Sequence, residues 1–268
     1  MDNAAAHRFA RDKGISRPVY GLTRGIVVPL FRAYFRMRID GAGHIPRDGA
    51  AVIAPNHKSF YDSFFFALAT PRPMRFMAKD ELISPWYGAY LARLGAFPVR
   101  RGESDEEALE TAREILRDGG LLALFPEGTR IRDPDTLGTP KRGAARLALE
   151  AGAPIVPAAI TGTDGLFAGP FPKPKRVQVA FEEPIPVHEL AATPEVAGEL
   201  IEEHVWPQVE RSWRRLRSRK TVAAALLAAA GVGGGVVATR RRRRPATRWE
   251  RVARSLGRGR GKRRRRRR

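Results

Sequence analysis

Between residues 50 and 181, short apolar runs alternate with longer segments in which apolar residues recur at helical spacing. Several runs are apolar on both faces, which is typical of buried strands in a sheet that helices cover. The expected strands are 51–54, 74–78, 96–100, 120–125, 154–160 and 177–181, and the expected helices are 61–69, 104–117, 142–151 and 195–217, the last interrupted near Pro207. This alternation predicts an α/β fold with a mixed, largely parallel sheet flanked by helices, and function in the loops beyond the strand ends.

The formal net charge of +21 comes from the C-terminal part of the chain. Residues 211–268 hold 23 of the 49 lysines and arginines and one acid, Glu250, so residues 1–210 are close to neutral. The basicity is therefore a property of the tail, which lacks the interleaved aromatic residues of a base-stacking surface. The absence of cysteine excludes disulfides and thiolate chemistry and fits a reducing cytosolic setting.

Two further segments suggest contact with a membrane. Residues 21–39 mix apolar and aromatic side chains with arginines, too many for a bilayer span but suitable for the headgroup boundary. A surface helix that packs on its own domain is the alternative. Residues 221–239 carry no charge and are long enough to span about 28 Å as a helix. Their alanines and glycines leave three interpretations open: a span, a membrane-dipping or oligomerising segment, and a flexible linker.

These features divide the chain into four parts. No secretory signal is visible at the N-terminus. The expected parts are an N-terminal amphipathic membrane-association segment (1–40), a single catalytic domain (41–217), an apolar Ala/Gly segment (218–239) and a disordered Arg-rich tail (240–268).

The stretch PNHKSFYD, residues 55–62, places a histidine and an aspartate five residues apart after an apolar run. Ser59 and Asp62 have the spacing of a capping box, so a helix start with an ordinary loop histidine is one interpretation. The other is a catalytic pair, because an N-cap at Ser59 would bring Asp62 in the first helical turn back to His57. A carboxylate bonded to one imidazole nitrogen leaves the other nitrogen as a general base.

Three other stretches follow expected strands. LFPEGTR (124–130) runs from a strand into a turn with a glutamate and an arginine, and GAFPVRRG (95–102) ends a strand in two arginines, whose guanidinium forks suit phosphate. A solvated turn and a solvated sheet edge are the ordinary alternatives. GAPIVPAAITG (152–162) is mostly core strand.

Together NHKSFYD, GAFPVRRG, LFPEGTR and PIVPAAITG resemble, in order and spacing, the four motif blocks of the glycerolipid acyltransferases, the PlsC-like family that includes the 1-acyl-glycerol-3-phosphate acyltransferases. The resemblance covers roughly residues 20–190. It implies acyl transfer from a thioester to the hydroxyl of lysophosphatidate, giving phosphatidate. Glycerol-3-phosphate, another lysolipid or a glycolipid remain alternative acceptors, and acyl-CoA and acyl carrier protein are alternative donors.

The resemblance also implies roles for individual residues. His57 is the general base and Asp62 orients it. Acceptor or phosphate contacts are implied for Lys79, Arg100, Arg101, Glu127, Gly128, Thr129 and Arg130. Roles in acyl-donor binding or fold integrity are implied for Asn56, Ser59 and Pro157. Pro98 and Arg100 stand where many members carry an aromatic residue and an acid, so the choice between Arg100 and Arg101 as the phosphate ligand stays open.

The family chemistry implies neither a metal nor a cofactor beyond the acyl-thioester co-substrate. The expected partners are acyl-CoA or acyl carrier protein, a lysophospholipid and an anionic membrane surface, and nucleic acid is not expected. The expected location is the cytoplasmic face of the cell membrane, held peripherally or by a single span. A hypothesis of another class is a non-catalytic polyanion or membrane binder that acts through the Arg-rich tail.

Overall fold

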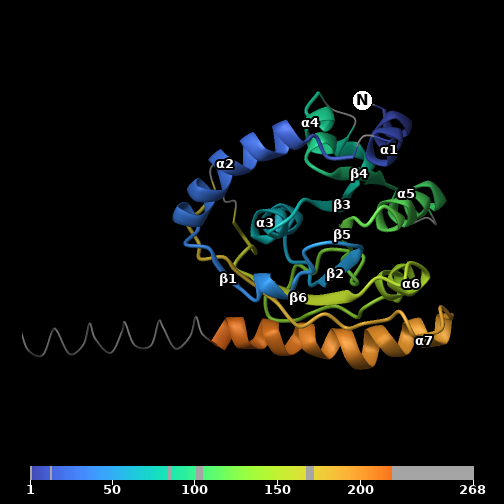
Figure 1. Ribbon diagram of the computed structural model, residues 1–268. Coiled ribbons are helices and arrows are strands. Elements are labelled where there is room, and N and C mark those ends of the chain that lie inside the picture. Colours follow the sequence, from blue (N-terminus) through green and yellow to red (C-terminus); the bar gives the residue numbers. More distant parts are fainter. Residues whose placement is uncertain (1, 13, 84–85, 101–104, 167–171, 219–268) are drawn as a thin grey trace, which may run out of the picture. The chain divides into compact units, whose positions relative to one another are not determined.

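A seven-stranded sheet organises the computed structural model, which describes residues 2–12, 14–83, 86–100, 105–166 and 172–218 (Figure 1). The strands are β1 (Arg38–Asp40), β2 (Ala51–Pro55), β3 (Met74–Lys79), β4 (Ala96–Val99), β5 (Leu121–Ala123), β6 (Ile155–Thr161) and β7 (Gln178–Phe181). Their order is β1-β7-β6-β2-β5-β3-β4. The strands from β6 to β4 are parallel, β7 is antiparallel to β6, and β1 is parallel to β7. The expected mixed, largely parallel sheet is confirmed.

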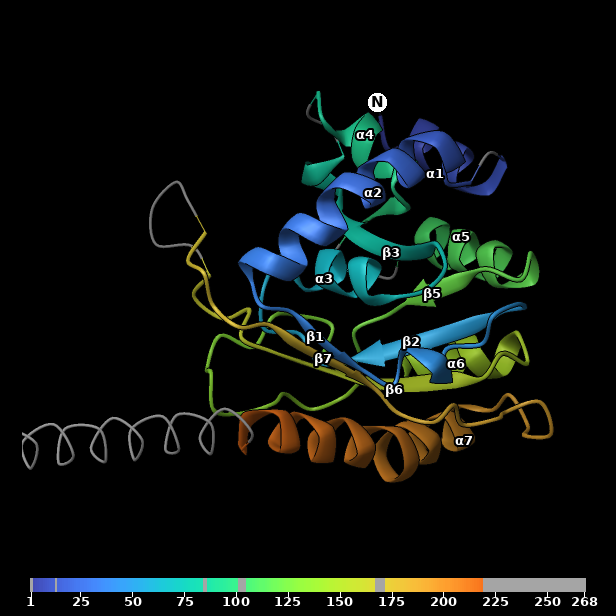
Figure 2. The ribbon, with the colours of Figure 1, turned by 60° about the vertical axis from the view of Figure 1, so that its left-hand side comes forward.

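Helices cover both faces of this sheet, as the two views show (Figures 1 and 2). The α-helices are α1 (Asn3–Asp12), α2 (Arg17–Tyr34), α3 (Asp62–Ala69), α4 (Gly88–Arg93), α5 (Glu106–Arg117), α6 (Gly143–Glu150) and α7 (Pro194–Glu199). Two short 3-10 helices, η1 (Ala42–His44) and η2 (Asp80–Leu82), and the π-helix η3 (Leu200–Val205), which continues into an α-helix over 206–218, complete the described elements. Aromatic residues of α2 and α3 pack on one face, and apolar residues of α5, α6 and the C-terminal helices pack on the other.

Most expected elements are present, and their ends differ from the expected ones by at most two residues. The helix expected to begin at residue 104 begins at Glu106, because the Asp105 carboxylate caps it by accepting a hydrogen bond from Ala108 N (3.3 Å). The interruption expected near Pro207 takes the form of η3 directly before it. A proline has no N–H to donate to the carbonyl four residues earlier, so the backbone changes its hydrogen-bonding pattern there.

The N-terminal segment differs most from expectation. The helix α1 and the strand β1 were not expected. The amphipathic segment expected over 21–39 is divided: α2 ends at Tyr34, Arg36 takes a positive φ of 43°, and the chain then enters β1. Within α2 the inward side is tied to α3, where Arg24 donates to Ala67 O (2.9 Å) and Thr70 O (2.5 Å).

The outward side of α2 is apolar. Leu22, Ile26 and Leu30, spaced four residues apart, are 68, 55 and 63% exposed. Among the described residues, no helix is both long and apolar enough to span a bilayer. The segment 218–239, expected as a possible span, lies outside the described residues apart from Ser218, as does the Arg-rich tail.

Candidate active site

His57 lies in the loop that directly follows β2. The strand ends at Pro55, and the next side chain, Asn56, is fully buried and continues the sheet ladder: its amide donates to Ile160 O (3.2 Å) and accepts from Ile160 N (2.8 Å). Asn56 therefore fixes the direction in which the chain leaves the sheet. Asn56 was considered for acyl-donor binding or for fold integrity, and its described contacts, both to the backbone of Ile160, are of the structural kind.

The His57 ring meets the carboxylate of Asp62, as the spacing led us to expect. His57 Nδ1 is 3.0 Å from Asp62 Oδ2, and both side chains are buried. The same oxygen accepts hydrogen bonds from Lys58 N (2.6 Å) and Ser59 N (2.7 Å). An ionised carboxylate only accepts, so the imidazole Nδ1 carries the proton in this arrangement and Nε2 holds a free lone pair.

Ser59 does not cap the helix, contrary to expectation. The helix α3 begins at Asp62, and Ser59 lies in the preceding turn, where its hydroxyl accepts a hydrogen bond from Tyr61 N (3.3 Å). One half of the capping box persists, because the Asp62 carboxylate still bonds Ser59 N. The Asp62 carboxylate thus binds the imidazole and gathers two backbone N–H groups at the same time.

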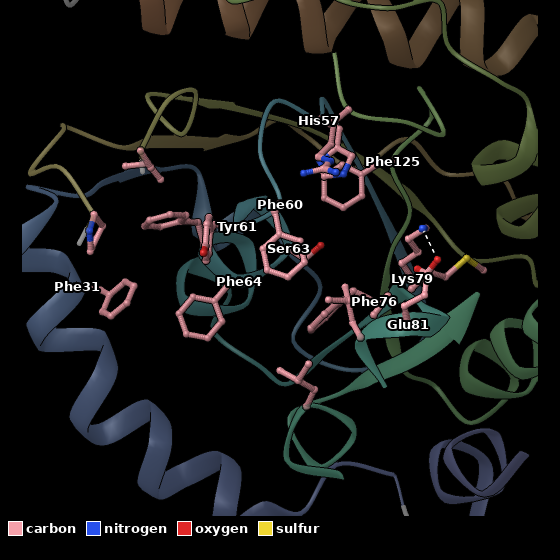
Figure 3. A pocket seen from close by; sticks show the side chains of 18 of the residues that line it. Phe31, His57, Phe60, Tyr61, Ser63, Phe64, Phe76, Lys79, Glu81 and Phe125 are labelled. Carbon is pink, nitrogen blue, oxygen red and sulfur yellow. Dashed lines mark hydrogen bonds and ion pairs between the residues drawn. The ribbon is translucent and has the colours of Figure 1, made fainter. Parts of the chain in front are cut away.

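A largely apolar pocket of about 470 Å³ opens beside His57 (Figure 3). The His57 ring stacks on Phe125, with centroids 4.0 Å apart and planes at 26°. Further aromatic residues come from the end of α2 and the residue after it, from the turn before Asp62, from α3 and from β3. The lining residues include Phe31, Phe35, Phe60, Tyr61, Phe64, Phe65 and Phe76. Pockets of this size and character are typical of sites for small apolar or amphiphilic ligands.

The residues of LFPEGTR divide between the core and the pocket. Glu127 is buried: Oε2 accepts from His57 N (2.5 Å) and Oε1 from Gly138 N (2.7 Å). Burial raises the pKa of Glu127, and the two backbone N–H donors oppose that rise. Gly128 turns the chain at φ 67°, Thr129 is exposed, and Arg130 lines the pocket. Glu127 was expected in acceptor binding, but its described contacts fix the His57 backbone.

Two basic residues stand at the ends of neighbouring strands: Lys79 is the last residue of β3, and Arg100 directly follows β4. Lys79 lines the pocket and its Nζ lies 2.5 Å from Glu81 Oε1. Arg100 is held by Asp105, which accepts from Arg100 N (2.7 Å) and from its guanidinium (3.4 Å). Burial raises the pKa of Asp105, but hydrogen bonds from Arg100 and Ala108 outweigh it and hold the pKa below its usual range.

Of the remaining expected site residues, one is not described and one lies away from the pocket. Arg101, one of the two candidate phosphate ligands, lies outside the described residues. Pro157 sits within β6, opposite Ala54 of β2, and does not line the pocket. Among the described residues no group of three or more histidine, aspartate or glutamate side chains has the arrangement of a metal site.

Sequence reasoning missed much of the pocket wall. The aromatic residue Phe60 lies within the motif that contains His57 and Asp62, Phe64 follows the motif in α3, and Phe31 lies in α2. The signal was the aromatic run FYDSFFF over 60–66, in which apolar residues stand on every side of a short helix. A helix that is apolar all round is packed on more than one side.

Comparison with known proteins places an acyltransferase domain in this part of the chain. Residues 36–161 match the family model Acyltransferase. The chain is 33% identical over 128 residues to the 1-acyl-sn-glycerol-3-phosphate acyltransferase of Bacillus subtilis, which covers 47% of this chain and 63% of that protein. It is 31% identical over 134 residues to a chloroplastic 1-acyl-sn-glycerol-3-phosphate acyltransferase of Arabidopsis thaliana, covering 48% of this chain and 37% of that protein.

A solved structure is similar to this chain as well. The crystal structure of the 1-acyl-sn-glycerophosphate acyltransferase PlsC from Thermotoga maritima superposes with a TM-score of 0.53 at 27% identity, over 71% of this chain and 81% of that one. The family-model match over residues 36–161, the curated relatives and this structure all support the PlsC-like family, in agreement with the resemblance drawn from the four motif blocks. The chain spans less than two thirds of the length of the two curated relatives named above.

Proposed function

We propose that the protein transfers a fatty acyl group from an acyl thioester to the free hydroxyl of lysophosphatidate, which gives phosphatidate. The observation that supports this most is the His57–Asp62 contact of 3.0 Å at the wall of an apolar pocket that also has basic side chains in its lining. Such a site can hold an acyl chain, a phosphate and a proton acceptor together, as an amphiphilic acceptor requires.

In the proposed reaction His57 is the general base. The acceptor hydroxyl gives its proton to Nε2 as its oxygen attacks the thioester carbonyl, and the Asp62 carboxylate at Nδ1 stabilises the resulting imidazolium. The tetrahedral intermediate then collapses: the new ester C–O bond remains and the C–S bond breaks. The proton on Nε2 passes to the leaving thiolate, so the dyad returns to its starting state and no other reactant is needed.

Substrate positioning is assigned to the pocket. Lys79 and Arg130 are the described cations in its lining, and we assign them to the acceptor phosphate, together with Arg101 beyond the described residues. The apolar wall would hold an acyl chain through buried apolar area. Either acyl-CoA or acyl carrier protein serves as donor in this scheme, since both present the same thioester.

We further propose that α2 rests on a membrane surface at the cytoplasmic face. Its exposed Leu22, Ile26 and Leu30 form one apolar stripe, while Phe31 on another side of the helix lines the pocket. A helix with such a stripe lies at the boundary between headgroups and acyl chains. The lysolipid would then enter the pocket directly from the membrane leaflet on which α2 rests.

The test is an acyl-transfer assay of purified protein, read by mass spectrometry. Donors are acyl-CoA and acyl carrier protein of several chain lengths. Acceptors are lysophosphatidate, glycerol-3-phosphate, another lysophospholipid and a monoacylglycerol without phosphate. We expect the highest kcat/KM with lysophosphatidate and a clear loss without phosphate. His57→Ala should reduce kcat by at least about 10²–10⁴-fold while the fold is retained by circular dichroism. Near-normal transfer by folded His57→Ala would exclude the general-base role.

A further inference from the structure

The segment between β5 and α6, residues 124–142, is a long loop without helix or strand, and we call it the β5–α6 loop. Loops of this length inside a compact domain are either functional or loosely held. This one carries Glu127 and Arg130, so its placement determines where the Arg130 guanidinium stands in the pocket. The contacts that fasten it therefore bear on the site.

One set of contacts joins the loop to the backbone of His57. Ile131 N donates to His57 O (2.9 Å), and the Glu127 carboxylate links His57 N to Gly138 N. The peptide groups on both sides of the His57 Cα are thus bonded to the loop. Any displacement of the loop changes the surroundings of the proposed base.

A second set of contacts begins at the next residue, Lys58. Its side chain is buried, and its Nζ donates to Asp133 O (2.7 Å) and to Thr136 O, while lying 5.3 Å from the ring centroid of Trp213. Burial lowers the pKa of Lys58, and the nearby Glu127 carboxylate acts in the opposite direction. Burying a lysine is costly unless its charge is compensated, and here two loop carbonyls and an indole ring compensate it. These contacts therefore tie the loop to Lys58.

The α-helix over 206–218, which we call the C-terminal helix, also contacts the β5–α6 loop and the Trp213 ring. Arg217 donates to Pro134 O (2.5 Å) and forms an ion pair with Asp135, and its guanidinium carbon lies 4.5 Å from the Trp213 ring centroid. Trp213 is itself buried against apolar residues of β6 and β7. Two cations from distant parts of the chain therefore meet one indole ring, and both bond the same stretch of loop.

We propose that Lys58, Trp213 and Arg217 form a clamp that positions the β5–α6 loop against His57, so that the C-terminal helix helps to place Arg130 for acceptor binding. The three are positioning residues, since none of them lines the pocket. The kinetic consequence rests on the proposed function, whereas the effect of the clamp on the loop is independent of it.

The test compares two arginines of the same helix. Arg217 reaches the loop, whereas Arg214 pairs with Glu210 one turn earlier and has the more exposed side chain (70% against 36%). In Arg217→Ala we expect hydrogen exchange at the Ile131 and Gly138 amides to accelerate by about fivefold or more. In Arg214→Ala it should match the unchanged protein.

The kinetic arm uses the same pair of variants. Arg217→Ala should raise the acceptor KM by about fivefold while kcat and the donor KM stay within about twofold, because the loop holds Arg130 but the dyad is intact. Lys58→Met should also raise the acceptor KM, whereas Lys58→Arg, which keeps the positive charge, should leave the acceptor KM closer to that of the unchanged protein. If the Lys58 variants fail to fold, the comparison of Arg217→Ala with Arg214→Ala still tests the clamp, because Arg217 is only partly buried.

The outcomes separate the two proposals. Unchanged exchange in Arg217→Ala, or equal changes in Arg217→Ala and Arg214→Ala, would overturn the clamp. A rise in acceptor and donor KM together would overturn its role in acceptor binding. Absence of acyl transfer in the unchanged protein would contradict the proposed function, and the exchange measurements would still report on the clamp.

Discussion

Replacing Asp62 by asparagine separates the charge of the dyad from its geometry. Asp62 Oδ2 accepts hydrogen bonds from His57 Nδ1, Lys58 N and Ser59 N, while Oδ1 is buried and has no hydrogen-bond partner among the described residues. An asparagine can place its oxygen where Oδ2 stands and its amide nitrogen where Oδ1 stands. The acceptor remains, and the negative charge beside the imidazole is lost.

Alanine at this position would be uninformative. It would leave three N–H donors unsatisfied, two of them buried and the Ser59 N–H half-buried, at up to about 3 kcal/mol each and roughly 9 kcal/mol at most. That is comparable with the whole free energy of unfolding of a typical domain, about 5–15 kcal/mol. Asp62→Asn keeps an acceptor, so we expect a loss of only about 2 kcal/mol and a folded protein.

The expected loss of rate follows from the lost charge. A carboxylate about 4 Å from an imidazolium stabilises it by about 4 kcal/mol at an effective dielectric constant near 20. The amide dipole retains part of this effect, and each 1.36 kcal/mol corresponds to a factor of ten. We therefore expect kcat to fall by about 10²–10³-fold, with a smaller change in acceptor KM, because the dyad acts on the transition state.

The assay is steady-state acyl transfer to lysophosphatidate, with thermal unfolding measured in parallel. Ser59→Ala is the matched control, since its hydroxyl bonds Tyr61 N in the same turn without touching His57. It should cost some stability and leave kcat within about twofold. A folded Asp62→Asn protein whose kcat lies within tenfold of the unchanged enzyme would show that Asp62 only organises the turn, and the proposed dyad would be wrong.

Two further predictions concern the N-terminal helices. Ile26→Asp should weaken co-flotation with anionic vesicles by about tenfold because it places a charge in the apolar stripe of α2, whereas Leu190→Asp, at an exposed leucine outside that stripe, should not; equal binding of both variants would contradict the membrane-facing role. Burial lowers the pKa of His7 in α1, whose ring is hydrogen-bonded to Thr111. The charged groups that act on this ring are Glu107, Asp105, Arg11 and Arg100. Below about pH 6.5 the unfolded chain therefore binds a proton at His7 more readily than the folded chain does. The free energy of unfolding measured in urea should therefore fall between about pH 7 and pH 5 more steeply than in His7→Gln, and parallel curves for the two proteins would refute this.

The sequence was most informative where structure is local. Buried strands such as 51–54 and 154–160 read as apolar runs because both of their faces are covered. The strand β1 was missed because it has only three residues, and its partner β7 lies about 140 residues further along the chain. The helix α1 was missed because its buried face rests on small residues, Ala6 and Ala10, rather than on a bulky apolar stripe.

In the site, too, contacts between residues close in sequence could be predicted, whereas contacts between distant segments could not. His57 and Asp62 are five residues apart, so the turn that joins them could be anticipated. The position of Glu127 could not, because a glutamate in a turn is usually solvated, and here it satisfies two backbone N–H groups inside the protein. Lys58 likewise has the sequence context of a solvated charge, and only the fold brings Trp213 and the loop carbonyls to it.

The pairing of β2 with β5 has a consequence for how such a chain can change over time. Ile53 lies opposite Ala123, and four residues further along each segment, in the loops that follow the two strands, stand His57 and Glu127, joined by the hydrogen bond from His57 N to the Glu127 carboxylate. Their distance depends on the register of two neighbouring strands and not on the 69 residues between them. Insertions and deletions in the loops between Asp62 and β5 leave this alignment intact as long as β2 and β5 keep their register. The loss of a single residue of β2 after Ile53 would turn the remaining side chains of that strand to the opposite face and shift His57 relative to Glu127.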